Sequence, residues 1–157
     1  MTGRPIFLAA LAAATLSAVT AHADGAAAYK RCAVCHLANG QGVPGAYPPL
    51  AGRVADLAAT PAGRAYLVLV PAKGVGGPMQ VNGTTYRGFM PQQAGLAASD
   101  LADLLNYAGQ TLGGSSAKGF KPFAPAEVDR ILKQHASAQP ADVAALRPKP
   151  ATVAARR

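Results

Sequence analysis

Cysteine is scarce in this chain of 157 residues. Cys32 and Cys35 are the only two, and a structural zinc site needs four protein ligands. The remaining candidates are poor: His22 lies in an N-terminal segment that we expect to be cleaved, and His135 stands alone in a polar stretch. The sequence therefore disfavours a structural zinc site.

Acidic residues are few as well. The chain has 7 Asp and Glu against 15 Lys and Arg, which gives a formal net charge of +8. It contains no motif of paired carboxylates, no Ser/His/Asp or Cys/His arrangement for nucleophilic catalysis, and no glycine loop suited to phosphate. We therefore do not expect an enzyme. We also expect no nucleic-acid partner.

A long apolar run is present only at the N-terminus. Arg4 precedes an apolar stretch from Ile6 to Val19, and Ala21-His22-Ala23 has the small residues of a cleavage site. The alternative, an uncleaved membrane anchor, would need about 20 apolar residues. The pattern predicts a signal peptide over residues 1–23, no transmembrane segment in the mature chain, and a periplasmic location.

The most informative motif is Cys32-Ala33-Val34-Cys35-His36. The C-x-x-C-H pattern is the attachment motif for c-type haem. Its thiols are one helical turn apart, so both can form thioethers with one porphyrin, and His36 can then bind the iron. A thioredoxin-like redox pair would want a βαβ context that is missing here, and a plain disulfide is a further alternative. We predict one covalent haem c.

The segments around this motif predict a mainly α-helical fold with one short β-hairpin. We expect a short helix over Gly25 to Arg31 with Tyr29 facing inward, and a Gly-rich loop after His36. A carbonyl of Pro48 or Pro49 could then accept the Nδ1 proton of His36.

Capping residues and turn motifs predict the later elements. Thr60-Pro61 should begin a helix that is stopped by Pro71 followed by Gly74, Gly76 and Gly77. Asn82-Gly83 predicts a type I′ hairpin. Ser99 should cap a helix from Asp100 to about Leu112, whose apolar stripe consists of Leu101, Leu104, Leu105 and Ala108.

A second axial ligand to the iron has two thioether candidates once Met1 is lost. Met90 lies in an irregular loop, Arg87 to Pro91, from which a side chain can reach over a haem. Met79 begins a predicted strand, so packing explains it more simply. We favour Met90, with Met79 and a non-Met or open sixth position as the alternatives.

Together these motifs resemble a bacterial class I monohaem cytochrome c. The resemblance rests on Cys32 to His36, Pro48-Pro49-Leu50, the hairpin followed by Phe89-Met90-Pro91, and the Leu-rich helix, and it covers residues 24–113. It implies a helical bundle around one haem with His36 and Met90 as iron ligands. Tyr29 departs from the family, which often has its aromatic residue one position earlier.

This coordination predicts electron transfer. An iron with both axial positions filled has no free position for dioxygen or peroxide, so it passes single electrons. We expect redox partner proteins, such as a dehydrogenase or a terminal oxidase, and the chain could itself be the cytochrome subunit of a dehydrogenase. The alternative is a haem enzyme or ligand sensor whose sixth position is open or displaceable.

Residues 114–157 extend beyond the resemblance. We expect a helical extension over 114–136, with a helix from Pro125 to about His135, and a Pro/Ala-rich basic tail over 137–157 that is disordered. Pro140 to Val143 repeats the helix-start pattern of Pro125 to Val128, although two copies are weak support for a repeat. The tail's positive charge would attract an acidic partner.

Overall fold

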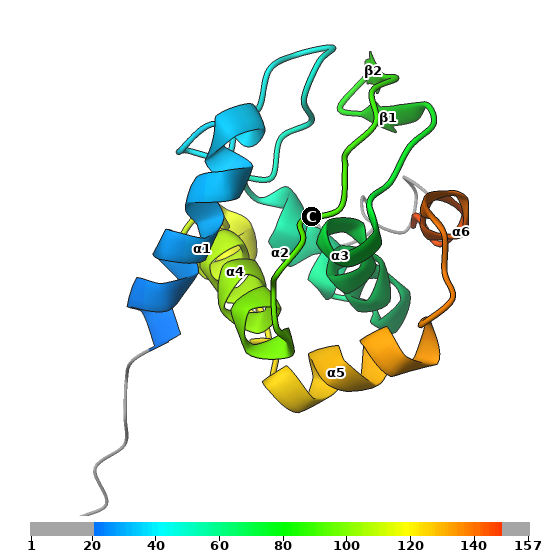
Figure 1. Cartoon of the computed structure of the whole chain (residues 1–157). Coiled ribbons are helices and arrows are strands. Elements are labelled where there is room, and N and C mark those ends of the chain that lie inside the picture. The colour runs from blue at the N-terminus through cyan, green and yellow to red at the C-terminus, as the bar shows by residue number, and fades with distance from the viewer. Residues whose placement is uncertain (1–20, 149–157) are drawn as a thin grey trace, which may run out of the picture.

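The computed structural model describes residues 21–148, and within that range the chain is mainly helical (Figure 1). The α-helices are α1 (Ala21–His36), α2 (Arg53–Ala58), α3 (Pro61–Lys73), α4 (Ala98–Gln110), α5 (Pro125–Gln134) and α6 (Pro140–Ala145). A 3₁₀ turn, η1 (Gly114–Ala117), follows α4, and β1 (Met79–Val81) pairs with β2 (Thr84–Tyr86). Among the described residues, no helix has the length and apolarity needed to cross a membrane.

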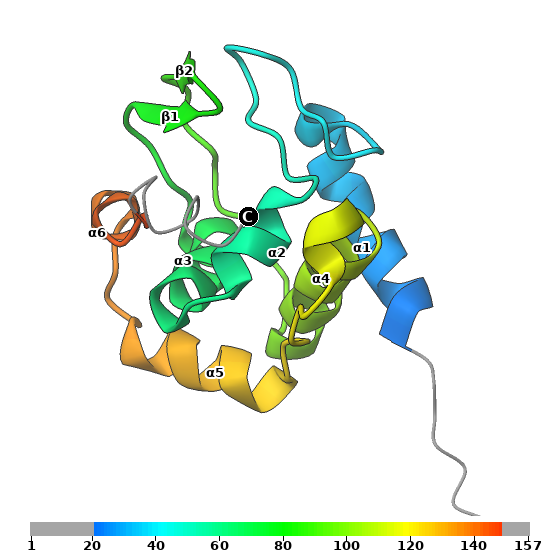
Figure 2. The ribbon, with the colours of Figure 1, turned by 180° about the vertical axis from the view of Figure 1, so that it is seen from behind.

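Helix α1 packs along α4, and the two run side by side in both ribbon views (Figures 1 and 2). A side chain at Gly25 would collide with the backbone of Asp103, so this glycine allows the close approach. The Tyr29 side chain is buried, and the centre of its ring lies 5.3 Å from that of the Tyr107 ring. The Tyr29 hydroxyl donates to the Leu37 carbonyl. Tyr29, which stands one position later than the aromatic residue often found in the family, thus contributes to the contact between α1 and α4. The helix also continues beyond the predicted Arg31, through His36.

The predicted apolar stripe of α4 is confirmed, because all four of its members are buried. The predicted cap is wrong. The helix begins at Ala98, and the N–H of Ala97 donates to the carboxylate of Asp100 at 2.9 Å. Asp100, in the first turn of the helix, therefore provides the hydrogen-bond acceptor at the helix start, and Ser99 does not cap the helix.

Helix α3 begins as predicted, since the Gly63 N–H donates to Thr60 Oγ1 at 3.1 Å. Pro71 alone does not stop it, and Gly74, the first of the predicted glycines, does. The helix continues to Lys73 and ends at Gly74, whose φ of 81° closes the last turn. A proline near a helix end removes only one backbone hydrogen bond, so the last turn tolerates it here.

The hairpin prediction is confirmed. Asn82 and Gly83 both have positive φ, at 51° and 79°, as a type I′ turn requires. The turn sets the register of β1 and β2, which places Met79 opposite Tyr86 and Val81 opposite Thr84.

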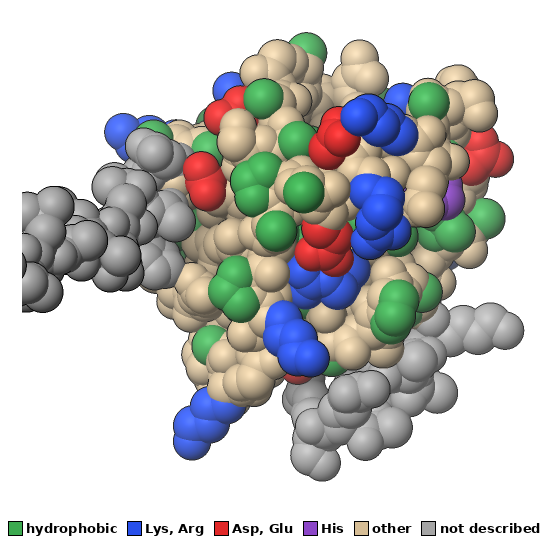
Figure 3. Space-filling view, turned by 90° about the horizontal axis from the view of Figure 1, so that it is seen from below, with side chains coloured by type: hydrophobic (Ala, Val, Ile, Leu, Met, Phe, Trp, Pro, Cys, Tyr) green, Lys and Arg blue, Asp and Glu red, His purple; other side chains and the backbone are tan. Residues whose placement is uncertain are grey.

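The two C-terminal helices pack against the helices that precede them. Helix α5 packs across α3 and α4 (Figure 2), one residue shorter than predicted, and buries Val128 and Ile131. On the face that α5 covers, basic and acidic side chains lie next to one another (Figure 3), as in the exposed Lys133–Asp129 pair at 2.7 Å.

The expectation of a disordered tail from residue 137 is wrong for residues 137–148. There α6 packs against α3 and its Val143 is fully buried. Residues 149–157 lie outside the described residues.

Candidate functional site

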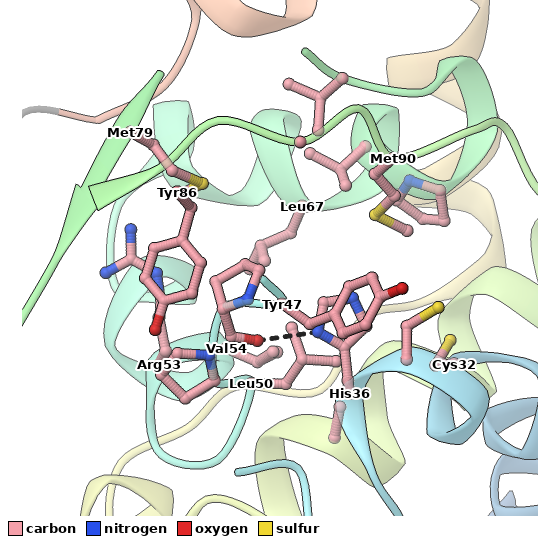
Figure 4. A pocket seen from close by; sticks show the side chains of 18 of the residues that line it. Cys32, His36, Tyr47, Leu50, Arg53, Val54, Leu67, Met79, Tyr86 and Met90 are labelled. Carbon is pink, nitrogen blue, oxygen red and sulfur yellow. Dashed lines mark hydrogen bonds between the residues drawn. The ribbon is translucent and has the colours of Figure 1, made fainter. Parts of the chain in front are cut away.

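A largely apolar cavity opens between α1, the loop that follows it, α3, the hairpin segment and α4 (Figure 4). All four residues that we predicted to hold the haem line it: Cys32, Cys35, His36 and Met90. Aliphatic side chains from several elements complete its walls: Leu50, Val54, Leu57, Leu67, Val70, Leu104 and Leu105. Such walls suit a large, flat, apolar ring.

The two thiols belong to the last turns of α1, which presents both to the cavity. Cys32 is buried, and burial raises the pKa of its thiol to about 11. Cys32 and Cys35 form no disulfide in the structure, so both sulfur atoms are available for bonds to a bound group. Conversion to a thioether would leave an uncharged, apolar group in the same place, which suits this environment.

His36 is buried at the end of α1, and its Nδ1 lies 2.8 Å from the Pro48 carbonyl oxygen. This confirms the predicted hydrogen bond. Because a carbonyl only accepts, Nδ1 carries the proton and donates, and Nε2 keeps its lone pair. The pKa of His36 is lowered, because burial lowers it more than the hydrogen bond to Pro48 raises it. The ring is thus an oriented, neutral imidazole, the form that binds metals.

The loop after His36 packs tightly enough to hold Pro48 in position. The Gly42 N–H donates to the His36 carbonyl at 2.9 Å. Gly42 has a φ of 65°, and a Cβ atom there would collide with the carbonyls of Tyr47 and Pro48. A side chain at position 42 would push this loop away from the imidazole.

Met90 reaches the cavity from a segment that pairs with the residues after α3. Val75 and Met90 exchange two backbone hydrogen bonds, of 2.9 and 2.8 Å. In Figure 4 the Met90 side chain lies across the cavity from His36, whereas Met79 lies beside Tyr86. The loop expected around Met90 is therefore anchored by a bridge, and Met79 begins β1 as predicted.

A polar rim at one end of the cavity was not foreseen from the sequence. Arg53, Tyr66, Tyr86 and Arg147 all line the cavity. They lie close together, since Arg147 Nε donates to the Tyr66 hydroxyl at 3.2 Å and the charges of Tyr66, Arg147 and Tyr86 all act on the pKa of Arg53. Arg53 opens α2 after Gly52, whose φ is 72°. Arg147 follows α6, and the repeated helix-start pattern at Pro140 was the available sign that this segment is structured.

The cavity is open to solvent beside two aromatic residues. Tyr47 and Phe89 both line it, and their exposed fractions are 43% and 63%. The edge of a ring bound in the cavity would lie close to the surface there, within reach of another protein.

Comparisons with known proteins support a haem protein for electron transfer. The sequence profile named cytochrome c matches residues 22–111. Cytochrome c-552 from one strain of Thermus thermophilus is 46% identical over 112 residues, which are 71% of this chain and 76% of that protein. A second cytochrome c-552 from Thermus thermophilus is 46% identical over 110 residues, 69% of this chain and 84% of the relative.

The chain belongs to the cytochrome c family, as a class I monohaem c-type cytochrome. It carries one covalently bound haem c, and Cys32 and Cys35 fit the C-x-x-C-H attachment motif. Proteins of this family are electron carriers that act with redox partners, and they are generally not enzymes.

Proposed function

We propose that this protein carries single electrons in a bacterial periplasm, on a haem bound by thioethers from Cys32 and Cys35 and ligated by His36 and Met90. The observation that carries the proposal is that His36 and Met90 line one apolar cavity from two independently anchored segments. The haem would supply a one-electron ferric/ferrous couple. The protein residues bind and orient it and exclude water.

The two axial ligands would set the chemistry of the iron. The His36 imidazole presents Nε2 because Nδ1 is bonded to Pro48. Thioether ligation by Met90 would favour the ferrous form and raise the reduction potential relative to two histidines. If His36 and Met90 both held the iron, dioxygen or peroxide would find no free position on it, which would separate a carrier from an oxidase or peroxidase.

The cellular location is supported by the sequence of residues 1–23, whose features suit a cleaved signal peptide. The protein would act either as a free carrier or as the cytochrome subunit of a dehydrogenase. Redox encounters are weak and small in area, so an exposed ring edge beside Tyr47 and Phe89 would suit them.

Spectroscopy of the purified holoprotein tests the electron-carrier proposal. We expect a sharp α-band in the reduced form, a reversible one-electron titration, and no change on addition of carbon monoxide. Carbon monoxide binding to the native reduced protein would contradict it and favour the alternative, a haem enzyme or sensor with an open sixth position.

Mass spectrometry of protein from the periplasmic fraction tests the location. The expected mature chain begins at Asp24 and carries one haem. An uncleaved chain, or one that remains in the cytoplasm, would contradict the proposed location and leave the electron-transfer proposal standing.

A further inference from the structure

The backbone that carries Met90 is fastened to the end of α3. The Gln93 N–H donates to the Pro71 carbonyl at 2.7 Å, inside the last turns of that helix. Val75 and Met90 exchange the two hydrogen bonds of their bridge. At Gly74, between these two points, a Cβ atom would lie 2.9 Å from the Met90 carbonyl oxygen. The position of Met90 therefore depends on the residues that end α3 and follow it.

Hydrogen bonds to the C-terminal segment hold this backbone on both sides of the bridge. Before the bridge, Lys73 Nζ donates at 2.7 Å to the carbonyl of Ala136, which lies between α5 and α6. After it, Arg147 donates from Nη2 to the Gly76 carbonyl at 3.3 Å and from Nη1 to the Pro78 carbonyl at 3.0 Å. All three donors are charged, and such hydrogen bonds are stronger than those between neutral groups.

The C-terminal segment is itself anchored. Helix α6 packs against α3 and buries Val143 completely. The Asp142 carboxylate accepts the Gln139 N–H at 2.8 Å at the start of this helix, and Arg147 Nε donates to the Tyr66 hydroxyl on α3 at 3.2 Å. Because the segment is held at both ends of α6, its contacts with the backbone near Met90 restrict how that backbone moves.

We propose that residues 136–147 form a strap that keeps Met90 on the iron, with Lys73 and Arg147 as positioning residues. This inference rests on the proposed ligation of the haem iron by Met90. A thioether that leaves the iron must move with its backbone, so contacts that hold this backbone oppose its release. The strap thus controls how often the sixth position opens to a small ligand, and it keeps the protein a carrier of electrons.

The expected effect is a change in the rate at which Met90 leaves the iron. A hydrogen bond from a charged donor contributes more than one between neutral groups, but the contact between Lys73 and Ala136 is exposed, which puts it at the low end of the range. Loss of this contact should therefore speed the release of Met90 by about tenfold.

Cyanide binding to the ferric holoprotein measures this release, because at high cyanide concentration the departure of Met90 limits the rate. Lys73→Leu removes the ammonium group and should speed binding, and Lys73→Arg should restore a slow rate because it keeps a donor. The residues that line the cavity do not include Lys73, so the variant leaves the haem contacts intact. Arg147→Gln should also speed binding. The matched control Lys133→Leu, on exposed α5, should not.

Two further measurements separate a strap from general stabilisation. Asn106→Ala removes two buried hydrogen bonds to Phe123 at the start of the extension, so it should lower the melting temperature without speeding cyanide binding. Hydrogen exchange at the Met90 N–H, which is bonded to the Val75 carbonyl, should be faster in Lys73→Leu than in the unsubstituted protein. This exchange reports on the bridge whichever residue holds the iron.

The proposal would be overturned by unchanged cyanide rates in both Lys73→Leu and Arg147→Gln, by equal acceleration in Lys133→Leu or Asn106→Ala, or by unchanged exchange at Met90 in Lys73→Leu. A failure of the proposed ligation is distinct from these results, because the unsubstituted ferric protein would then lack the red absorption band of methionine-ligated haem.

Discussion

Asn106 and Phe123 form a closed pair of hydrogen bonds in the interior of the protein. Asn106 Nδ2 donates to the Phe123 carbonyl at 3.0 Å, and the Phe123 N–H donates to Asn106 Oδ1 at 2.6 Å. Both residues are buried. One side chain of α4 thus satisfies the backbone of the segment that leads to α5, and it joins the extension to the matched part of the chain.

Asn106→Ala should destabilise the holoprotein by about 2–4 kcal/mol, because it leaves a buried N–H and a buried carbonyl without partners. Chemical denaturation of the two proteins measures the difference. The control Gln134→Ala removes an exposed amide at the end of α5 and should stay within about 0.5 kcal/mol of the native protein. Equal losses in the two variants would contradict the assigned role of Asn106.

Arg64 and Glu127 predict a pH dependence of stability. Arg64 Nε and Nη2 each donate to one carboxylate oxygen of Glu127 at 2.6 Å, and the guanidinium lies 3.8 Å from the centre of the Phe123 ring. The hydrogen bond from Arg64 is the main cause that lowers the pKa of Glu127. This stabilisation is present above the ordinary glutamate pKa and is lost as pH falls through the folded-state value.

Glu127→Gln should therefore cost about 1 kcal/mol at neutral pH, and its difference from the native protein should shrink as the medium becomes acidic. Denaturation at a series of pH values measures this. The matched control is Asp129→Asn, which removes the exposed pair with Lys133 and should cost no more than about 0.5 kcal/mol. A difference for Glu127→Gln that stays constant down to strongly acidic pH would contradict the prediction.

Met90 and Met79 are distinguished by substitution. Met90→Ala should abolish the weak red absorption band of methionine-ligated ferric haem and allow the reduced protein to bind carbon monoxide. Met79→Ala should keep the band, because Met79 lies beside Tyr86 at the start of β1 (Figure 4). The reverse pattern would assign the sixth position to Met79.

The haem should also be required for folding. The cavity it would fill lies at the centre of the packing between α1, α3 and α4, and an empty apolar cavity of that extent is costly. Cys32→Ala combined with Cys35→Ala should leave the apoprotein largely unfolded. Circular dichroism in the far ultraviolet measures the remaining helix, and native helicity without haem would show that the protein packs without it.

Local chemistry explains which features the sequence predicted. Two thiols one helical turn apart and the adjacent His36 need only one helix, and the stiff Pro48-Pro49 segment left few carbonyls that could accept from the imidazole. The Thr60 cap and the Asn82-Gly83 turn likewise involve only residues that are close in the sequence. Each of these predictions depends on short-range geometry.

Features that depend on distant partners were missed. The α6 segment is rich in Pro and Ala, which favours disorder, but α3 offers a surface that buries Val143. Arg147 lines the cavity because the contact between α3 and α6 holds the segment that follows α6. The cap of α4 was missed for a local reason, because Asp100 in the first turn accepts the N–H of Ala97, so the helix begins at Ala98 and Ser99 lies inside its first turn.

Two truncations separate the structural part of the C-terminal segment from its charge. Deleting residues 137–157 removes α6 with the buried Val143, so the melting temperature should fall by several degrees. Deleting only 149–157 removes Lys149, Arg156 and Arg157 and should leave the haem spectrum and melting temperature unchanged.

The shorter deletion should still alter encounters with a redox partner. Because the three lost cations would attract an acidic protein, electron transfer to such a partner should slow at low ionic strength and depend less steeply on salt. Stopped-flow rates over a salt series measure both effects. Identical rates for the full-length protein and the 149–157 deletion at every salt concentration would show that these charges have no part in the encounter, whereas a loss of stability in the shorter deletion would place a structural contact beyond residue 148.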